Sequence, residues 1–171
     1  MSIPKKPLKA KLVVSFVSKS SKLINSSIEQ VAIKYGAPDY VSAIGGFTHT
    51  KYYDEELGDG LKRRFAAFTK MVKRDDLPKI KKFTNLIELD SSVKGKRKVN
   101  IDPGILTVEN FILASGKNFT HRVYLKDGIF ADLTLIFTKN DFLELPWTYP
   151  DYRERDVKDM LKKIRATAFL M

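Results

Sequence analysis

The segment at residues 146–152 constrains the fold most strongly, because two prolines four residues apart exclude a regular helix or strand across it. It reads Pro-Trp-Thr-Tyr-Pro-Asp-Tyr and contains the only Trp of the chain. Each proline fixes φ and removes a backbone donor, so we expect a rigid, extended connector. Rigid aromatic loops either close the edge of a core or line a binding surface. Regular structure must therefore lie on either side of this connector.

The composition is that of one globular domain, and we expect a single α+β domain over residues 1–171. No apolar run has the length needed to cross a bilayer. The chain has no cysteine, which excludes disulfides, Cys-ligated zinc and thiol nucleophiles. With two histidines it predicts no metal site, and it identifies no cofactor. The absence of cysteine and of a signal-peptide core together favour a cytoplasmic protein.

The net charge of +11, from 31 Lys and Arg against 20 Asp and Glu, favours anionic partners. Nucleic acids, phosphate-bearing small molecules and acidic proteins all fit this charge. The alternative is a Lys-rich surface of the kind found in heat-adapted proteins. The basic residues are spread along the chain, so composition alone leaves the two interpretations open.

The order of the predicted elements indicates a ferredoxin-like α+β core. A short apolar strand is expected at residues 11–17, followed by a helix that Ser20 or Ser21 caps and Gly36 ends. The next elements are a strand at residues 40–49 weakened by two glycines, an ambiguous segment at 61–72, a helix opened by Asp75 or Asp76, a short strand at 98–101 broken at 102–104, and a short helix at 106–115.

The segment at residues 61–72 decides this order. Its apolar residues fit a helix face, with Leu61, Phe65 and Phe68, and they also fit an alternating strand. A strand gives the order β-α-β-β-α-β, the ferredoxin-like arrangement, extended by a helix, a β-hairpin and a C-terminal helix. Asp151 with Glu154 is expected to form a capping box at the start of that last helix.

The hairpin around Asp127-Gly128 can be predicted to the residue. A three-residue loop at 126–128, with Gly128 left-handed and a bulge, pairs Arg122 with Asp132 and Tyr124 with Phe130. The same register gathers the apolar residues of both strands on one face, which we expect to be the buried one. Those residues are Val123, Leu125, Ile129, Ala131 and Leu133.

Two polar groups are candidates for a binding site. Asn100 and Asp102 share one face of a predicted strand, where a carboxylate serves as a base or a hydroxyl acceptor. An Asp-Pro-Gly turn explains the same residues without a function. Arg122, Tyr124 and Asp132 share one face of the hairpin and fit an anionic ligand, or equally an ordinary cross-strand ion pair.

Basic and aromatic residues extend the candidate set. Lys62, Arg63 and Arg64 fit an anion-binding edge, as do Lys81 and Lys82, although most such clusters are simply solvated. Trp147 and Tyr149 of the connector could stack on bases, as could other dispersed tyrosines, Tyr52, Tyr53 and Tyr152. Alternation predicts that His121 is a buried, hydrogen-bonded histidine. His49 has no obvious partner in the sequence.

Several enzyme classes are excluded by the absence of their motifs. The sequence contains no G-x-x-x-x-G-K-[ST] phosphate loop and no G-x-G-x-x-G after a strand. It also lacks the G-x-S-x-G turn of α/β-hydrolases.

The chain resembles an uncharacterised bacterial family, the domain-of-unknown-function family 4416. Six stretches in the family's order carry the resemblance, at residues 52–58, 61–65, 82–85, 99–104, 121–125 and 146–152. Members of this family are often labelled GTP-binding proteins, a label that the missing phosphate loop does not support. The family pattern has Glu where this chain has Asp132 and no His at His49, which argues against a catalytic His49.

These observations lead to three hypotheses. The first is a protein that binds an anionic ligand, a nucleotide or an RNA segment, without a membrane role. The second is an enzyme acting on a phosphate-containing substrate, metal-assisted or not, with Asp102 as base or metal ligand and Arg122 stabilising charge. The third is a protein–protein adaptor whose aromatic connector docks a partner. The sequence predicts no oligomeric state.

Overall fold

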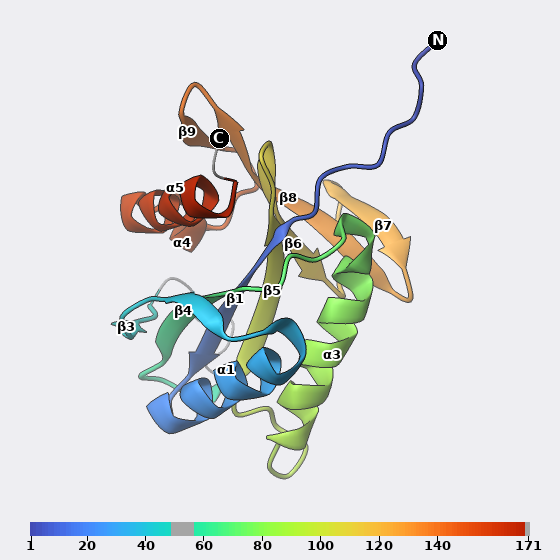
Figure 1. The fold of residues 1–171 in the computed structure, drawn as a ribbon. Coiled ribbons are helices and arrows are strands. Elements are labelled where there is room, and N and C mark those ends of the chain that lie inside the picture. The colour runs from blue at the N-terminus through green and yellow to red at the C-terminus, as the bar shows by residue number, and fades with distance from the viewer. Residues whose placement is uncertain (49–56, 170–171) are drawn as a thin grey trace.

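The computed structural model describes residues 1–48 and 57–169. Within them, one antiparallel sheet of nine strands has the order β2-β4-β1-β5-β6-β8-β7, with β3 paired to β4 and β9 paired to β8 (Figure 1). The strands are β1 (Lys11–Ser18), β2 (Pro38–Val41), β3 (Gly45–Gly46), β4 (Lys62–Phe68), β5 (Asn100–Leu106), β6 (Asn110–Ser115), β7 (Arg122–Lys126), β8 (Ile129–Thr138) and β9 (Asp141–Glu144). The helices are α1 (Ser21–Tyr35), α3 (Leu77–Asp90) preceded by the 3-10 turn η1 (Arg74–Asp76), α4 (Pro150–Arg153) and α5 (Arg155–Ala168).

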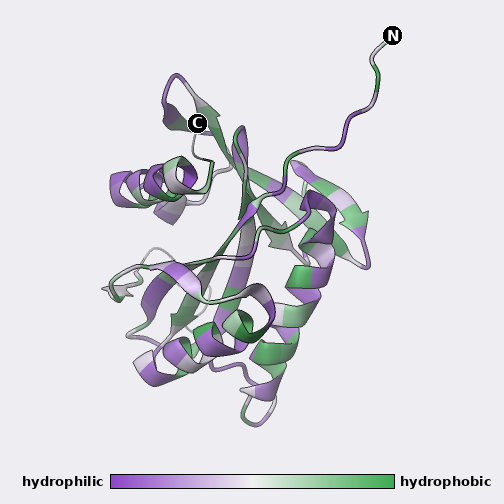
Figure 2. Ribbon diagram, viewed as in Figure 1, coloured by the Kyte–Doolittle hydropathy of each residue, from purple (hydrophilic) through white to green (hydrophobic). Residues whose placement is uncertain are grey.

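Helices cover both faces of the sheet. Helices α1 and α3 pack on one face, where the alternate β1 residues Leu12, Val14 and Phe16 are buried. Helix α5 packs on the other face with Val13, and the two sides are separate in Figure 1. Figure 2 shows why both sides are needed, because the central strands are mainly hydrophobic while the helices carry hydrophobic and hydrophilic bands.

The predicted boundaries of the first helix are confirmed. Ser20 is the N-cap of α1, and its hydroxyl accepts a hydrogen bond from the Leu23 amide at 3.2 Å. Gly36 ends the helix with φ of 82°, and its amide donates to the Ala32 carbonyl. The helix therefore starts and stops where local chemistry predicts.

The α+β class is confirmed, and residues 62–68 form a strand as the ferredoxin-like order required. Strands β2, β4, β1 and β5 lie side by side in that order, and β1 pairs antiparallel with both β4 and β5. Strands β6 to β9 extend the sheet to nine described strands, where the prediction had a helix and one hairpin. The expected strand at residues 40–49 is replaced by the two short strands β2 and β3.

Two predictions about residues 98–115 were wrong. The expected helix at 106–115 is the strand β6, because Phe111 and Leu113 alternate into the core while β5 and β8 pair on both sides. The expected break at 102–104 does not occur, since β5 runs through these residues. Pro103 is tolerated because β5 pairs with β6 only from Gly104 onward, so one side of Pro103 needs no strand partner.

The hairpin has the predicted register, with Arg122 opposite Asp132 and Tyr124 opposite Phe130. The loop differs, because Lys126 already pairs with Ile129 and the irregularity lies between Tyr124 and Lys126. The prediction that the apolar face of this hairpin is buried and its polar face exposed was wrong near Val123 and Asp132. There Val123 is 66% exposed and Asp132 only 1% exposed, because the connector and His121 cover the polar face.

None of the helices within the described ranges is both long and apolar enough to span a bilayer.

Candidate functional site

A cleft of about 820 Å³ opens on the sheet face that α4 and α5 flank. It lies where β5 and β6 cease to pair, since their ladder covers only residues 104–106 of β5. The part of β5 that pairs with β1 but not with β6 contributes to the lining, as do the residues that follow β6. Six of the predicted site residues line it: Arg63, Asn100, Asp102, Arg122, Asp132 and Tyr149.

Helix α3 supplies the groups that replace β6 along this part of β5. Lys81 Nζ donates to the Ile101 carbonyl at 2.9 Å, and the Ile101 amide donates to Glu88 Oε1 at 2.6 Å. These two side chains are seven residues apart, so they lie on one face of the helix, two turns from each other. Both backbone groups of Ile101 are thus satisfied on the side where β6 does not pair with β5.

The same helix fixes the carboxylate of Asp102. Lys81 Nζ lies 3.2 Å from Asp102 Oδ1, and Asn100 Nδ2 donates to Asp102 Oδ2 at 2.6 Å. Arg97 joins this group to Glu88, donating to Asn100 Oδ1 at 3.0 Å and to Glu88 Oε2 at 3.1 Å. The Asp102 side chain is 34% exposed, so a ligand in the cleft can reach it.

Glu88 is a buried ionisable residue, with only 4% of its surface exposed. Burial raises the pKa of its carboxyl, and the neighbouring charges of Lys81 and Arg97 oppose that rise in part.

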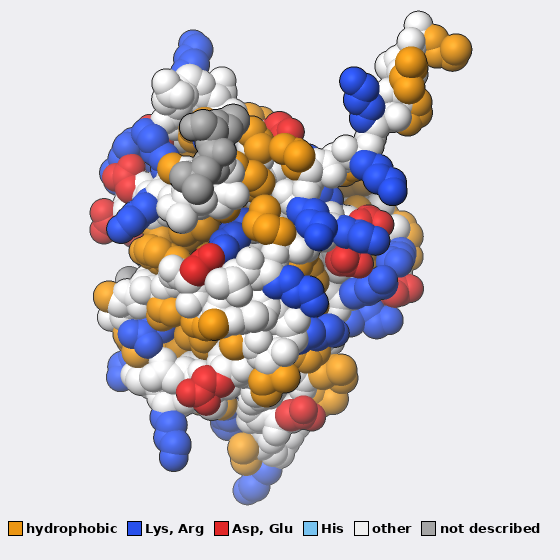
Figure 3. Space-filling model, in the orientation of Figure 1, with side chains coloured by type: hydrophobic (Ala, Val, Ile, Leu, Met, Phe, Trp, Pro, Cys, Tyr) orange, Lys and Arg blue, Asp and Glu red, His pale blue; other side chains and the backbone are white. Residues whose placement is uncertain are grey.

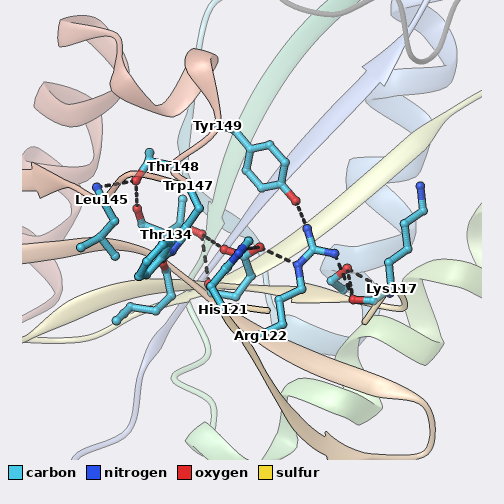
Figure 4. A network of polar contacts seen from close by, with 11 residues as sticks. Lys117, His121, Arg122, Thr134, Leu145, Trp147, Thr148 and Tyr149 are labelled. Atoms are coloured by element: carbon cyan, nitrogen blue, oxygen red, sulfur yellow. Dashed lines mark hydrogen bonds and ion pairs between the residues drawn. The ribbon is translucent and has the colours of Figure 1, made fainter. Parts of the chain in front are cut away.

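Arg122 also lines the cleft, and its guanidinium is bonded to three partners (Figure 4). Its Nε donates to Asp132 Oδ2 at 2.8 Å, its Nη1 to the Lys117 carbonyl at 3.0 Å, and its Nη2 to the Tyr149 hydroxyl. His121 Nε2 lies 3.1 Å from the same oxygen of Asp132. A guanidinium has five N–H donors, so two are without a partner among the described residues.

Tyr149 presents a neutral phenol to the cleft. Burial, followed by the charge of Asp132, raises the pKa of Tyr149 to about 12. Its oxygen accepts from Arg122, and among the described residues no group accepts its own proton. The hydroxyl is therefore a donor that a ligand can use.

The aromatic connector is rigid because it is bonded to β8. Trp147 Nε1 donates to the Leu133 carbonyl at 2.8 Å, and its ring stacks on His121 with centroids 5.0 Å apart. Thr148 Oγ1 donates to the Thr134 carbonyl at 2.6 Å and accepts from the Leu145 amide at 2.8 Å. These contacts, shown in Figure 4, hold Tyr149 against Arg122.

The connector prediction needs two corrections. Its last residues form the one-turn helix α4, with a proline in the first turn as helices tolerate. The capping box of Asp151 with Glu154 is wrong, because Glu154 is itself the N-cap of α5 and makes no side-chain capping bond. Asp151 instead bonds Arg63, and both side chains are at most 12% exposed. Arg63 also lies over the Phe65 ring, at 4.6 Å from its centroid.

Four predicted residues lie outside the cleft. Lys62 and Arg64 point to the α1 face, because strand alternation separates them from Arg63, and Arg64 Nη1 donates to Asn25 Oδ1 at 2.8 Å. Tyr124 is 58% exposed and packs on Phe130. Trp147 supports the connector without lining the cleft. His49, Tyr52 and Tyr53 lie outside the described residues.

Sequence reasoning missed the contribution of α3 and its neighbours. The missed residues lining the cleft include Ser15, Glu88, Arg97, Lys117 and Asp151. One signal was available, because Lys81 and Glu88 share a helix face with the buried Leu77, Ile80 and Ile87. A buried Lys and Glu on an apolar stripe require polar partners.

The cleft alternates charges rather than concentrating one sign. Its lining includes five cationic side chains, Arg63, Lys81, Arg97, Lys117 and Arg122, and four anionic ones, Glu88, Asp102, Asp132 and Asp151. Within residues 1–48 and 57–169, no three His, Asp or Glu side chains lie close enough to hold a metal ion. The arrangement suits a ligand with both acidic and donor groups.

Comparison with curated proteins and with solved structures finds no match. One family model, described as "Domain of unknown function (DUF4416)", matches residues 8–167. This match covers nearly the whole chain, the cleft included, and agrees with the resemblance that the motifs indicated. The chain therefore belongs to the domain-of-unknown-function family DUF4416.

Proposed function

We propose that this protein binds an anionic small molecule of nucleotide size in the cleft between β5 and β6. The observation that carries the proposal is the pairing of Arg122 with Tyr149. Asp132, the Lys117 carbonyl and the connector hold these two side chains in place before any ligand arrives. Preorganised donors of this kind favour an anion, because little side-chain entropy is lost on binding.

The size of the cleft supports a small molecule. Its volume of about 820 Å³ lies within the range of roughly 300–1,000 Å³ that is usual for ligand sites. A phosphate would meet Arg122 and Tyr149, and hydroxyl or amino groups would meet Asp102. A nucleotide carries both kinds of group, whereas inorganic phosphate carries only the first.

The RNA and adaptor hypotheses receive less support. Docking at the aromatic connector was the basis of the adaptor hypothesis and one of the grounds, beside the net charge and the polar hairpin face, for the RNA hypothesis. The Trp147 ring, however, is stacked on His121 and its Nε1 donates to the β8 backbone. A base or a partner peptide would have to displace these internal contacts.

An enzyme acting on a phosphate-containing substrate is the second candidate, because the partly exposed Asp102 shares the cleft with Arg122. Asp102 would accept a proton from the attacking hydroxyl while Arg122 stabilises the charge that develops on the phosphate. Turnover decides this candidate. A phosphoesterase panel with and without Mg²⁺ that stays flat, with wild-type behaviour of Asp102→Asn, removes it.

Thermal unfolding against a panel of nucleotides, phosphosugars and inorganic phosphate tests the proposal. A ligand at one hundred times Kd should add about 2.7 kcal/mol to the free energy of unfolding. Titration calorimetry with the ligand so found then compares wild type with Arg122→Lys, which keeps the charge beside Asp132 and loses the planar fork.

We expect Arg122→Lys to weaken binding by roughly tenfold or more, since a charge-assisted hydrogen bond contributes about 1.5–3 kcal/mol. The control is Arg155→Lys, an exposed ion-paired arginine on α5 that is no part of the cleft. A flat panel, or equal affinity for Arg122→Lys and wild type, contradicts the proposal.

A further inference from the structure

A second hollow gathers lysines that are far apart in the sequence. It has a volume of about 310 Å³ and lies where the start of β1, the end of α1 and the segment before η1 meet. Ala10 and Val72 are bridged there, and the Lys70 amide donates to the Tyr35 carbonyl at 3.1 Å. The lysines in its lining are Lys9, Lys34, Lys70, Lys73 and Lys79. Together they are called the lysine pocket below.

The lysine pocket is strongly positive. Among the described residues its one acidic lining residue is Asp76, whose carboxylate already lies 3.3 Å from Lys79 Nζ. Lys34 Nζ lies over the Phe83 ring, 4.4 Å from its centroid. Within the described parts of the chain, no carboxylate lies within ion-pair distance of Lys9, Lys70 or Lys73. In Figure 3, Lys and Arg side chains extend below the point where the N-terminal segment leaves the molecule, with some acidic side chains among them.

An uncompensated lysine cluster has a physical consequence. Five lysines against Asp76 leave a net charge of +4 in the described lining of the hollow, and the repulsion among these like charges opposes folding. A bound polyanion would relieve the repulsion and release its own counterions, which favours association.

We infer that the lysine pocket binds the phosphate backbone of single-stranded nucleic acid. Lysines act as point charges that follow a flexible chain of phosphates without reading its bases. The hollow admits a phosphate group, whereas a protein partner would need a broader complementary surface. Of its lining, only Met71 is an apolar residue with appreciable exposure, so the pocket itself offers little for insertion into lipid.

Fluorescence anisotropy with labelled oligouridylate, measured from about 50 mM to 200 mM salt, tests this inference. The variant is Lys70→Gln with Lys73→Gln. Removing two phosphate contacts should lower the magnitude of the slope of log K against log salt by about 1.4, and weaken binding at low salt at least several-fold. The same variant, without RNA, should unfold at a higher temperature than wild type at low salt.

The control is Lys22→Gln with Lys163→Gln, which removes the same charge from exposed positions on α1 and α5 outside both hollows. An equal loss of binding in this control would show that total charge, not the pocket, attracts RNA. Absence of salt-sensitive binding by wild type would also overturn the inference. Because exposed Ile3 and Leu8 precede Lys9, anionic phosphatidylserine vesicles form a further arm. Binding to vesicles but not to RNA would assign the pocket to membranes instead.

Discussion

At the scale of single residues, the cleft depends on Asp132. This carboxylate is 1% exposed, accepts a hydrogen bond from Arg122 and contacts His121. It therefore holds the Arg122 side chain in position beside the cleft. Its negative charge is compensated only while Arg122 stays in place, and the reverse is equally true. Breaking such a buried pair is costly because the remaining charge has no partner.

We predict that Asp132→Ala lowers the free energy of unfolding by about 3–5 kcal/mol, because the Arg122 guanidinium loses its buried counter-charge. Urea denaturation monitored by Trp147 fluorescence gives the value. The matched control is Asp141→Ala, which removes an exposed partner of Arg155 and should leave stability close to wild type. A small effect of Asp132→Ala would mean that the Arg122 side chain is held by other contacts.

The raised pKa of Glu88 makes the free energy of unfolding depend on pH. Its pKa is raised in the folded protein, mainly by burial, so the folded state binds this proton more tightly than the unfolded state does. The associated stability is complete below the unfolded pKa, about 4.3 for Glu, and is lost as pH rises through the folded pKa.

Glu88→Gln removes this titration and keeps an oxygen that can accept from the Ile101 amide. Urea denaturation of both proteins at several pH values above about 4.3 should show a flatter dependence for the variant. Parallel curves for the two proteins would show that Glu88 does not titrate differently on folding.

At the scale of elements, Gly104 explains how β5 and β6 converge beside the cleft. A Cβ atom at this position would lie 2.5 Å from Cζ of Phe111 and 2.8 Å from its Cε2. Phe111 is 1% exposed and stacks on Tyr152, so it has little room to move. The two strands can pair at this point only because residue 104 has no side chain.

Gly104→Ala should therefore destabilise the protein by about 1–3 kcal/mol through overpacking. Differential scanning calorimetry measures the loss. Gly116→Ala is the comparison, because nothing lies within 4 Å of a Cβ built there, and it should change stability by no more than about 0.5 kcal/mol. If both substitutions are equally tolerated, Phe111 adjusts and the close approach is not required.

Local chemistry explains which elements could be predicted. The cap at Ser20, the stop at Gly36 and the hairpin register follow from nearby residues, and all three are confirmed. The strand β6 could not be predicted, because its apolar residues fit a helix as well until β5 and β8 pair beside it. Pro103 likewise appears as a strand breaker unless the end of the β5–β6 ladder is known.

The same distinction applies to the candidate site. Strand alternation placed Asn100 with Asp102, and turn chemistry paired Arg122 with Asp132, because each pair is local or on one hairpin. The contacts of Lys81 with Asp102 and of Arg63 with Asp151 join distant segments of the chain. Only tertiary structure brings these together.

At the scale of the whole molecule, the two hollows differ in their balance of charge. Among the described residues, the lining of the cleft has five cations and four anions, whereas that of the lysine pocket has five cations and one anion. A small polar ligand fits the first and a polyanion fits the second. The two proposals are therefore independent, and either can fail without the other.

The central claim is that the cleft between β5 and β6 is the ligand site. A crystal structure of the protein with the nucleotide or phosphosugar that stabilises it tests this claim most directly. The account predicts ligand density in the cleft, with the anionic group within hydrogen-bond distance of Arg122 and Tyr149 and a donor group near Asp102. Ligand bound in the lysine pocket or elsewhere, with the cleft holding only water, would contradict it.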